Sequence, residues 1–188
     1  METVVINLIG GPGAGKSTFA HGLMYELKVS GIECEFAAEY AKDVFFEENP
    51  KKLDNQIYIF GKQLQRLKRL EGKVDIIVTD APLLHSIYYD AKNRKTFRSL
   101  VLEEFNSFKN LNILLSRNHI YNPTGRFQDE QSADAIHQRL KEILDENTIE
   151  YLALESIREN LQTVFRQAEL MISKKSNGRI YPKYTNGI

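Results

Sequence analysis

The chain has 188 residues, of which 42% are hydrophobic, and its 25 Lys and Arg residues balance its 25 Asp and Glu residues. This length favours a single domain with its own core, and the absence of net charge argues against a protein that a broad cationic field holds to nucleic acid or to a membrane. The apolar runs are too short to span a bilayer, the start of the chain lacks the basic residues of a signal peptide, and Cys34 has no second cysteine to pair with, so we expect a cytoplasmic protein with no membrane partner.

Short apolar runs alternate along the chain with longer helical patterns. The runs predict strands at residues 4–9, 33–38, 74–79, 111–115 and 150–153. The periodic segments predict helices at residues 16–29, 53–70, 131–146 and 157–173, with further helical material between residues 82 and 108. Strands that alternate with helices of this length predict an α/β fold, a parallel sheet of about five strands with helices on both faces.

A phosphate-binding loop follows the first predicted strand. Residues 10–17, Gly-Gly-Pro-Gly-Ala-Gly-Lys-Ser, fit the P-loop pattern G-x-x-x-x-G-K-[ST] at every fixed position. Glycines let backbone N–H groups turn toward a polyphosphate, and the helix that begins at Lys16 adds the positive end of its dipole. We therefore expect a three-layer P-loop NTPase fold that binds ATP and Mg²⁺, with Lys16 at the β- and γ-phosphates and the Ser17 hydroxyl on the metal; GTP as the donor stays open. The expected cofactor-binding residues are Gly10, Gly11, Pro12, Gly13, Ala14, Gly15, Lys16, Ser17 and Thr18.

Two carboxylates follow neighbouring strands of this predicted sheet, Glu39 after the second and Asp80 after the third. In open α/β sheets, ligands bind beyond the carboxyl ends of the strands. Phosphoryl transfer to a hydroxyl needs one carboxylate to orient that hydroxyl and accept its proton, and another to organise Mg²⁺. We predict Glu39 as the base and Asp80 as the metal residue beside Ser17, although the spacing alone also allows the reverse. The structural alternatives are a helix N-cap for Glu39 and a turn acid before Pro82 for Asp80.

The segment after the fourth strand is predicted to be a lid at about residues 117–130. Arg117 and Arg126 are expected to close over the transferring phosphoryl group, because a planar guanidinium suits that charge and a closed lid excludes water. The alternative is a surface loop with two exposed arginines. Residues 1–174 are expected to form one kinase domain with this lid, and residues 175–188 a C-terminal tail.

The predicted helix at residues 53–70 carries a basic face with Lys62, Arg66 and Arg69. Such a stripe is normally solvated, and the alternative is a groove for the phosphates of a nucleotide or DNA acceptor. Gln56 and Gln63 of the same helix are candidates for hydrogen bonds to a base edge.

Five segments together resemble a family of bacteriophage P-loop kinases that are similar to thymidylate kinase and include the 5-hydroxymethyluracil DNA kinases. They are residues 10–18, Glu39-Tyr-Ala-Lys-Asp43, residues 56–63, Thr79-Asp-Ala-Pro-Leu-Leu84 and residues 121–126. The order is also similar to the ribosylnicotinamide kinase half of the bacterial regulator of NAD biosynthesis, above all between residues 125 and 151. The resemblance covers about residues 3–155. It implies an ATP-dependent kinase, in the host cytoplasm if a phage encodes it, that phosphorylates the hydroxymethyl group of a modified thymine in DNA.

One departure from this family bears on the acceptor. Thymidylate kinases usually have Asp-Arg after the third strand, with the Arg on the acceptor monophosphate, whereas this chain has Asp80-Ala81. We therefore expect a nucleoside-type acceptor, with 5-hydroxymethyl-deoxyuridine in phage DNA as the first candidate. The alternatives are a free nucleoside or nucleotide kinase, for ribosylnicotinamide or a deoxynucleotide, and a P-loop ATPase or GTPase switch without an acceptor. The expected catalytic residues are Lys16, Glu39, Asp80, Arg117 and Arg126; the oligomeric state stays open.

Overall fold

The computed structural model of the chain describes residues 2–48, 50–122 and 129–173. Its five parallel strands run in the order β2-β3-β1-β4-β5. The strands are β1 (Val4–Ile9), β2 (Cys34–Ala37), β3 (Ile76–Thr79), β4 (Lys109–Ser116) and β5 (Leu152–Glu155). The helices are α1 (Lys16–Val29), α2 (Tyr40–Phe46), a 3₁₀ turn at Pro50–Asp54, α3 (Gln56–Lys68), α4 (His85–Tyr89), α5 (Lys95–Asn106), α6 (Glu130–Glu146) and α7 (Glu159–Ser173). The predicted α/β fold with a five-stranded parallel sheet is confirmed.

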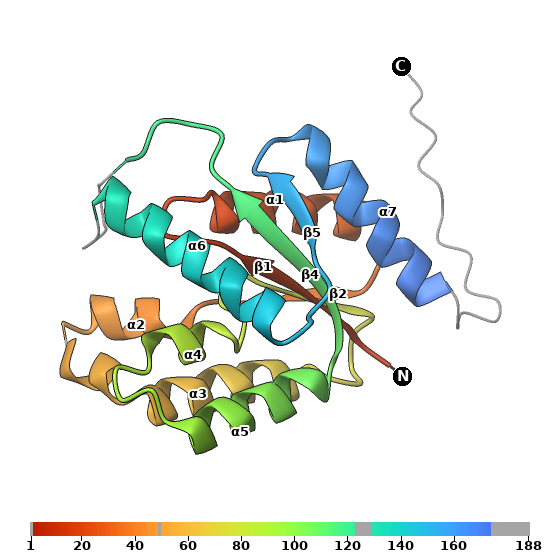
Figure 1. Cartoon of the computed structure of the whole chain (residues 1–188). Coiled ribbons are helices and arrows are strands. Elements are labelled where there is room, and N and C mark those ends of the chain that lie inside the picture. Colours follow the sequence, from red (N-terminus) through yellow and green to blue (C-terminus); the bar gives the residue numbers. More distant parts are fainter. Residues whose placement is uncertain (1, 49, 123–128, 174–188) are drawn as a thin grey trace.

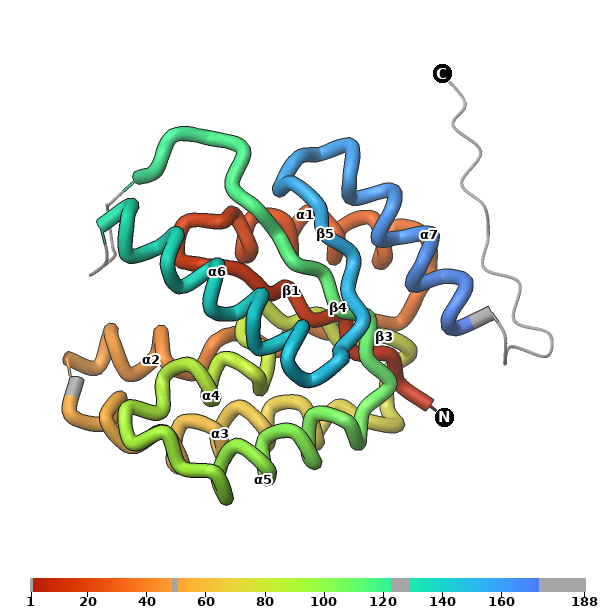
Figure 2. Tube along the Cα trace, viewed as in Figure 1, coloured from red at the N-terminus to blue at the C-terminus, as the bar shows by residue number. Residues whose placement is uncertain are grey.

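Helices cover both faces of this sheet, because alternate residues of the strands point to opposite sides. In β1, Val4, Ile6 and Leu8 pack with α1 and α7, while Val5 and Ile9 pack with α3, α5 and α6. Figures 1 and 2 show α1 and α7 side by side on one side of the sheet, with α3 and α5 on the other. Two apolar cores therefore hold the sheet between its helical layers.

The carboxyl ends of β2, β3 and β1 lie at the same end of the sheet. Ala37 of β2 is paired with Thr79 of β3, and Thr79 is also paired with Asn7 of β1. Because the three strands are parallel neighbours, the segments that follow them emerge at the same end of the sheet. These segments contain the phosphate-binding loop, Glu39 and Asp80.

Some boundaries differ from those that the sequence predicts. The helix expected at residues 53–70 begins only at Gln56, because the Asn55 side chain accepts the Tyr58 N–H at 3.2 Å and caps α3. The helical stretch before residue 108 is divided into α4 and α5 at Asp90, whose carboxylate accepts the Arg94 N–H at 2.8 Å. The last strand begins two residues later than expected, since Leu152 is the first residue that pairs with β4.

The remaining expectations fall partly outside the described residues. Residues 123–128 of the predicted lid and the predicted tail at 175–188 lie outside them. Over residues 2–48, 50–122 and 129–173, no helix has both the length and the apolar composition that crossing a bilayer requires.

Candidate active site

In the loop between β1 and α1, the surrounding atoms leave no space for a side chain at the positions of Gly11 and Gly15. Gly13 and Gly15 have positive φ angles of 75° and 79°, a backbone conformation that residues other than glycine rarely adopt. A Cβ atom added to Gly11 would lie 2.3 Å from the Ala133 backbone oxygen of α6, and one added to Gly15 would lie 2.3 Å from Ser156 Oγ. The loop is therefore enclosed by α6 on one side and by the segment after β5 on the other.

The Lys16 ammonium lies over this loop. Its Nζ donates hydrogen bonds to the backbone oxygens of Gly10 at 2.8 Å and Gly11 at 3.0 Å. Lys16 is also the first residue of α1, where backbone N–H groups without helical partners favour an anion. Charge and backbone dipole therefore favour a polyphosphate at the same point, as the sequence motif predicts.

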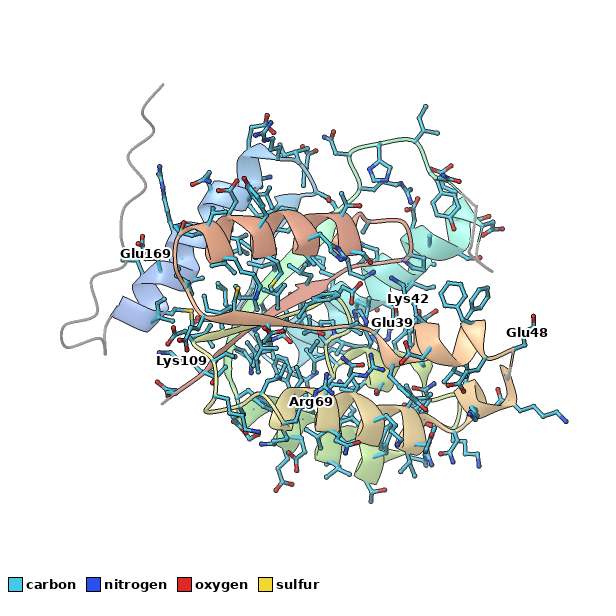
Figure 3. The ribbon with its side chains drawn as sticks, turned by 180° about the vertical axis from the view of Figure 1, so that it is seen from behind. Glu39, Lys42, Glu48, Arg69, Lys109 and Glu169 are labelled. Atoms are coloured by element: carbon cyan, nitrogen blue, oxygen red, sulfur yellow. The ribbon has the colours of Figure 1, made fainter. Side chains whose placement is uncertain are left out.

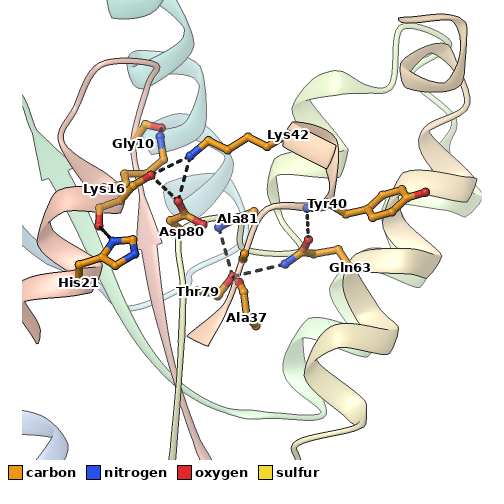
Figure 4. Close-up of polar contacts among 12 residues, drawn as sticks. Gly10, Lys16, His21, Ala37, Tyr40, Lys42, Gln63, Thr79, Asp80 and Ala81 are labelled. Atoms are coloured by element: carbon orange, nitrogen blue, oxygen red, sulfur yellow. Dashed lines mark hydrogen bonds and ion pairs between the residues drawn. The ribbon is translucent and has the colours of Figure 1, made fainter. Parts of the chain in front are cut away.

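Ser17 and Asp80 form the second part of the site. Ser17 Oγ donates to Asp80 Oδ2 at 2.5 Å, and Lys42 Nζ of α2 lies 2.9 Å from Ser17 Oγ and 3.5 Å from Asp80 Oδ2 (Figure 4). Asp80 is only 3% exposed, and its Oδ1 has no hydrogen-bond partner in the part of the chain that the structure describes. A buried carboxylate oxygen without a partner beside a hydroxyl suits a hard divalent cation such as Mg²⁺, so these residues fit the expected metal.

Glu39 lies beside these groups at the start of α2. It occupies the N-cap position, but its side chain makes no capping hydrogen bond, so the N-cap interpretation does not account for its carboxylate. Burial raises the pKa of Glu39 above its ordinary value; the charge of Asp80 adds to this rise, and the charges of Lys16 and Lys42 oppose it. Figure 3 shows Glu39 and Lys42 near each other, one helical turn apart. The site therefore combines two carboxylates with two ammonium groups.

A hydrogen-bond network of three buried or half-buried residues fixes the backbone on either side of these carboxylates. Gln63 of α3 accepts the Tyr40 N–H at 3.0 Å and donates to Thr79 Oγ1 at 3.4 Å, and Thr79 in turn donates to the Ala37 oxygen at 2.8 Å (Figure 4). The expectation that Gln56 and Gln63 contact a base is wrong. Both side chains are buried, and Gln56 donates to the Leu53 oxygen at 2.8 Å.

Of the two predicted lid arginines, the structure describes Arg117, which contacts α6 and Tyr121. The Arg117 guanidinium is paired with Glu130 at 3.1 Å and Asp134 at 2.7 Å, both on α6, and lies over the Tyr121 ring. Arg126 lies outside the described residues. The catalytic assignment of both arginines stays a prediction.

Two residues that the sequence analysis did not single out lie near the loop. They are Lys42, already described, and His85 of α4. Tyr89 of the same helix lies near Glu39. Burial lowers the pKa of His85 to about 3, with the charge of Lys16 adding to the effect, and its buried Nε2 has no partner within the described residues. Burial, with the charge of Glu39, raises the pKa of Tyr89. The spacing of Lys42 three residues after Glu39, on the same face of a helix, is a sequence signal that could have identified it.

The basic face of α3 lines a cavity of about 240 Å³ beyond these groups. Its walls are Tyr40, Lys62, Gln65, Arg66 and Arg69. Arg66 donates to the Ala38 oxygen at 3.0 Å and pairs with Asp43, so its guanidinium is held in place. The cavity therefore begins at Tyr40, the residue that follows Glu39.

Comparisons with known proteins concern the fold that carries this site. A family model described as an AAA domain matches residues 5–161. Among curated proteins, none matches the sequence. The NadR protein, whose crystal structure was solved in complex with NR, has a similar fold, with a TM-score of 0.64 and 14% identity over 87% of this chain and 51% of that chain. Thymidylate kinase from Ehrlichia chaffeensis gives a TM-score of 0.57 and 11% identity over 92% of this chain and 100% of that chain. The chain thus spans about half the length of the NadR chain, and at these identities both likenesses concern the fold.

Proposed function

The chain belongs to the AAA domain family whose model matches residues 5–161, and we propose that it is a kinase that transfers the γ-phosphoryl group of ATP to a hydroxyl of a nucleoside-type acceptor. The observation that carries this proposal is the placement of Glu39 beside the loop lysine and Asp80, with a raised pKa and no capping hydrogen bond. A protein that only binds a nucleotide, as a sensor does, has no need of a second carboxylate there. Similarity in fold to NadR and to a thymidylate kinase supports the same class.

The roles follow from the contacts within the site. Lys16 and the loop amides hold the phosphates, and Ser17 with Asp80 holds Mg²⁺. Bound Mg²⁺–ATP would supply the phosphoryl group, and its metal would neutralise part of the negative charge on the phosphate oxygens. The enclosure of the loop by α6 and by the segment after β5 limits the access of water to this end of the sheet.

Glu39 has the role of base in this proposal. Its carboxylate orients the acceptor hydroxyl and takes up its proton as the new oxygen–phosphorus bond forms, while the bond from the γ-phosphorus to the β,γ-bridging oxygen breaks and ADP leaves. A raised pKa improves a carboxylate as a proton acceptor, because the efficiency of a general base increases as its pKa approaches the working pH. The network through Gln63 and Thr79 holds the backbone that carries both carboxylates.

The acceptor we favour is a 5-hydroxymethyl-deoxyuridine within DNA. The motifs quoted above support it through their resemblance to the phage kinases, as does Ala81, which replaces the arginine that clamps a free monophosphate in thymidylate kinases. The cavity lined by Lys62, Arg66 and Arg69 supports it further, because cations beside the aromatic ring of Tyr40 suit a nucleic acid strand. A free nucleoside such as ribosylnicotinamide is the second candidate, and the similarity of fold to NadR favours it.

The test offers the protein ATP labelled on its γ-phosphoryl group together with a panel of acceptors. The panel contains nucleosides including ribosylnicotinamide, nucleoside monophosphates, and single- and double-stranded DNA with and without 5-hydroxymethyluracil. We expect label only in the DNA that carries the modified base. Label in a free nucleoside or nucleotide would replace this acceptor but keep the kinase, and label in free phosphate alone, with every acceptor present, would refute the kinase in favour of an ATPase or a GTPase.

A further inference from the structure

Lys42 belongs to this site although no motif predicts it. We propose that its ammonium and Mg²⁺ compete for one position between Ser17 Oγ and Asp80 Oδ2, so that Lys42 sets the Mg²⁺ concentration at which the chain binds a nucleotide. This inference rests on the proposed function, because it concerns the metal of the same site.

The first argument is geometric. Lys42 Nζ lies 2.9 Å from Ser17 Oγ and 3.5 Å from Asp80 Oδ2, and these oxygens are themselves 2.5 Å apart. One cation therefore contacts the hydroxyl and the carboxylate together. A second cation bound to the same two oxygens would lie against the ammonium, and like charges at that separation repel. Binding of the metal to this pair requires Lys42 to leave.

The second argument is the charge balance of Asp80. Its side chain is 4% exposed, and a buried carboxylate without a cation is costly. Lys42 forms an ion pair with Asp80, and Lys16 donates hydrogen bonds to the loop oxygens. Mg²⁺ carries twice the charge and replaces the ammonium without leaving Asp80 unbalanced.

The third argument is that Lys42 can move while its helix stays in place. Its side chain is 52% exposed, and a lysine has a flexible stem of four carbons, so its rotation displaces no packed group. The first turn of α2 is held by the hydrogen bond from Tyr40 N–H to Gln63. The exchange therefore changes one side chain and leaves the position of Glu39 intact.

The experiment titrates Mg²⁺ into the full chain with a fixed concentration of a fluorescent ADP analogue and measures the Mg²⁺ midpoint of nucleotide binding. It compares wild type with Lys42→Met, Lys42→Arg and, as a control for loss of an exposed lysine, Lys95→Met on α5. We expect Lys42→Met to lower the midpoint about three- to tenfold, as the loss of one competing ion pair implies. Lys42→Arg, which keeps the charge, and Lys95→Met are expected to stay within about twofold of wild type.

The outcomes separate this inference from the function on which it rests. An unchanged or higher midpoint in Lys42→Met, with wild-type binding that depends on Mg²⁺, overturns the exchange and leaves the kinase proposal standing. Wild-type chain that binds no nucleotide at any Mg²⁺ concentration overturns the proposed function itself. Circular dichroism checks that each variant is folded, and Lys42→Gln repeats the test if Lys42→Met is not.

Discussion

Replacing Gln63 by leucine tests whether the network below the carboxylates positions Glu39. In the structure, Gln63 Oε1 accepts the Tyr40 N–H at 3.0 Å, and its Nε2 donates to Thr79 Oγ1 at 3.4 Å. Gln63→Leu keeps the size of the side chain and removes both interactions. Its principal effect is to leave the Tyr40 N–H without an acceptor. Tyr40 is the first residue of α2 and directly follows Glu39.

The size of the effect follows from these two contacts. A buried donor that loses its acceptor costs about 1–3 kcal/mol, and Tyr40 N–H is partly buried, so we expect a loss of about 1–2 kcal/mol in the free energy of unfolding. Because a displacement of about 1 Å of a catalytic group lowers a rate by up to about 100-fold, we expect kcat of phosphoryl transfer to fall about 10- to 100-fold. ATP binding should stay within about twofold of wild type, since no described hydrogen bond of Gln63 reaches the phosphate-binding loop.

Three measurements decide between positioning and simple stabilisation: urea unfolding, nucleotide affinity by fluorescence, and the rate of transfer at saturating ATP. Gln167→Leu is the matched control, because Gln167 is an exposed residue of α7 far along the chain from the site. A variant that loses stability but transfers the phosphoryl group at the wild-type rate would refute the positioning role. A Gln63→Leu variant that is as stable as wild type would show that the hydrogen bond to Tyr40 does not contribute as the structure implies.

Three further predictions concern the loop and its neighbours. Lys16→Ala should remove nearly all transfer activity and weaken ATP binding, since Lys16 is the cation at the loop; labelled-ATP transfer and calorimetry measure the two effects. Gly11→Ala should cost about 1–3 kcal/mol in urea unfolding, because its Cβ would lie 2.3 Å from a backbone oxygen of α6. Gly61→Ala, where nothing lies within 4 Å, should instead add about 0.5–1 kcal/mol, and equal effects of the two alanines would contradict the packing. Lys42→Met should raise the pKa of the Glu39 carboxyl in the Mg²⁺-free chain, because a nearby positive charge lowers that pKa and the substitution removes it; a carboxyl titration followed by NMR measures the change.

Local sequence patterns were sufficient to predict the phosphate-binding loop and the two carboxylates that follow neighbouring strands. The glycines and Lys16 mark the loop because their chemistry is fixed by the phosphate, and the apolar runs before Glu39 and Asp80 mark two strands. Parallel strands that end together then bring both carboxylates to one edge, which the pairing of Ala37 with Thr79 bears out. That prediction required only that the strands before Glu39 and Asp80 be parallel neighbours.

Contacts between elements could not be predicted in the same way. Lys42 reaches Ser17 across 25 residues, and Gln63 reaches Tyr40 across 23, and both contacts depend on how α2 and α3 dock beside β2. The interpretation of Gln63 as a base-contacting residue was wrong because a helical pattern does not show which polar side chains a neighbouring backbone will bury. Arg117 likewise pairs with two acids of α6, whose approach to the strand end no local pattern indicates.

The structure also supplies an argument for dividing the roles of the two carboxylates, which spacing left open. Asp80 is 3% exposed and hydrogen-bonded to the hydroxyl that the loop motif assigns to the metal, whereas Glu39 is half-buried and contributes no capping bond. A metal ligand must keep its charge, and a base must exchange a proton with a group that enters from outside. We therefore expect Asp80→Asn to abolish the Mg²⁺ dependence of nucleotide binding. Glu39→Gln should leave that binding within about twofold of wild type and slow transfer by about 100-fold or more. Calorimetric titration with and without Mg²⁺, together with single-turnover transfer, measures both, and the opposite pattern would reverse the assignment, with Asp80 as the base and Glu39 at the metal.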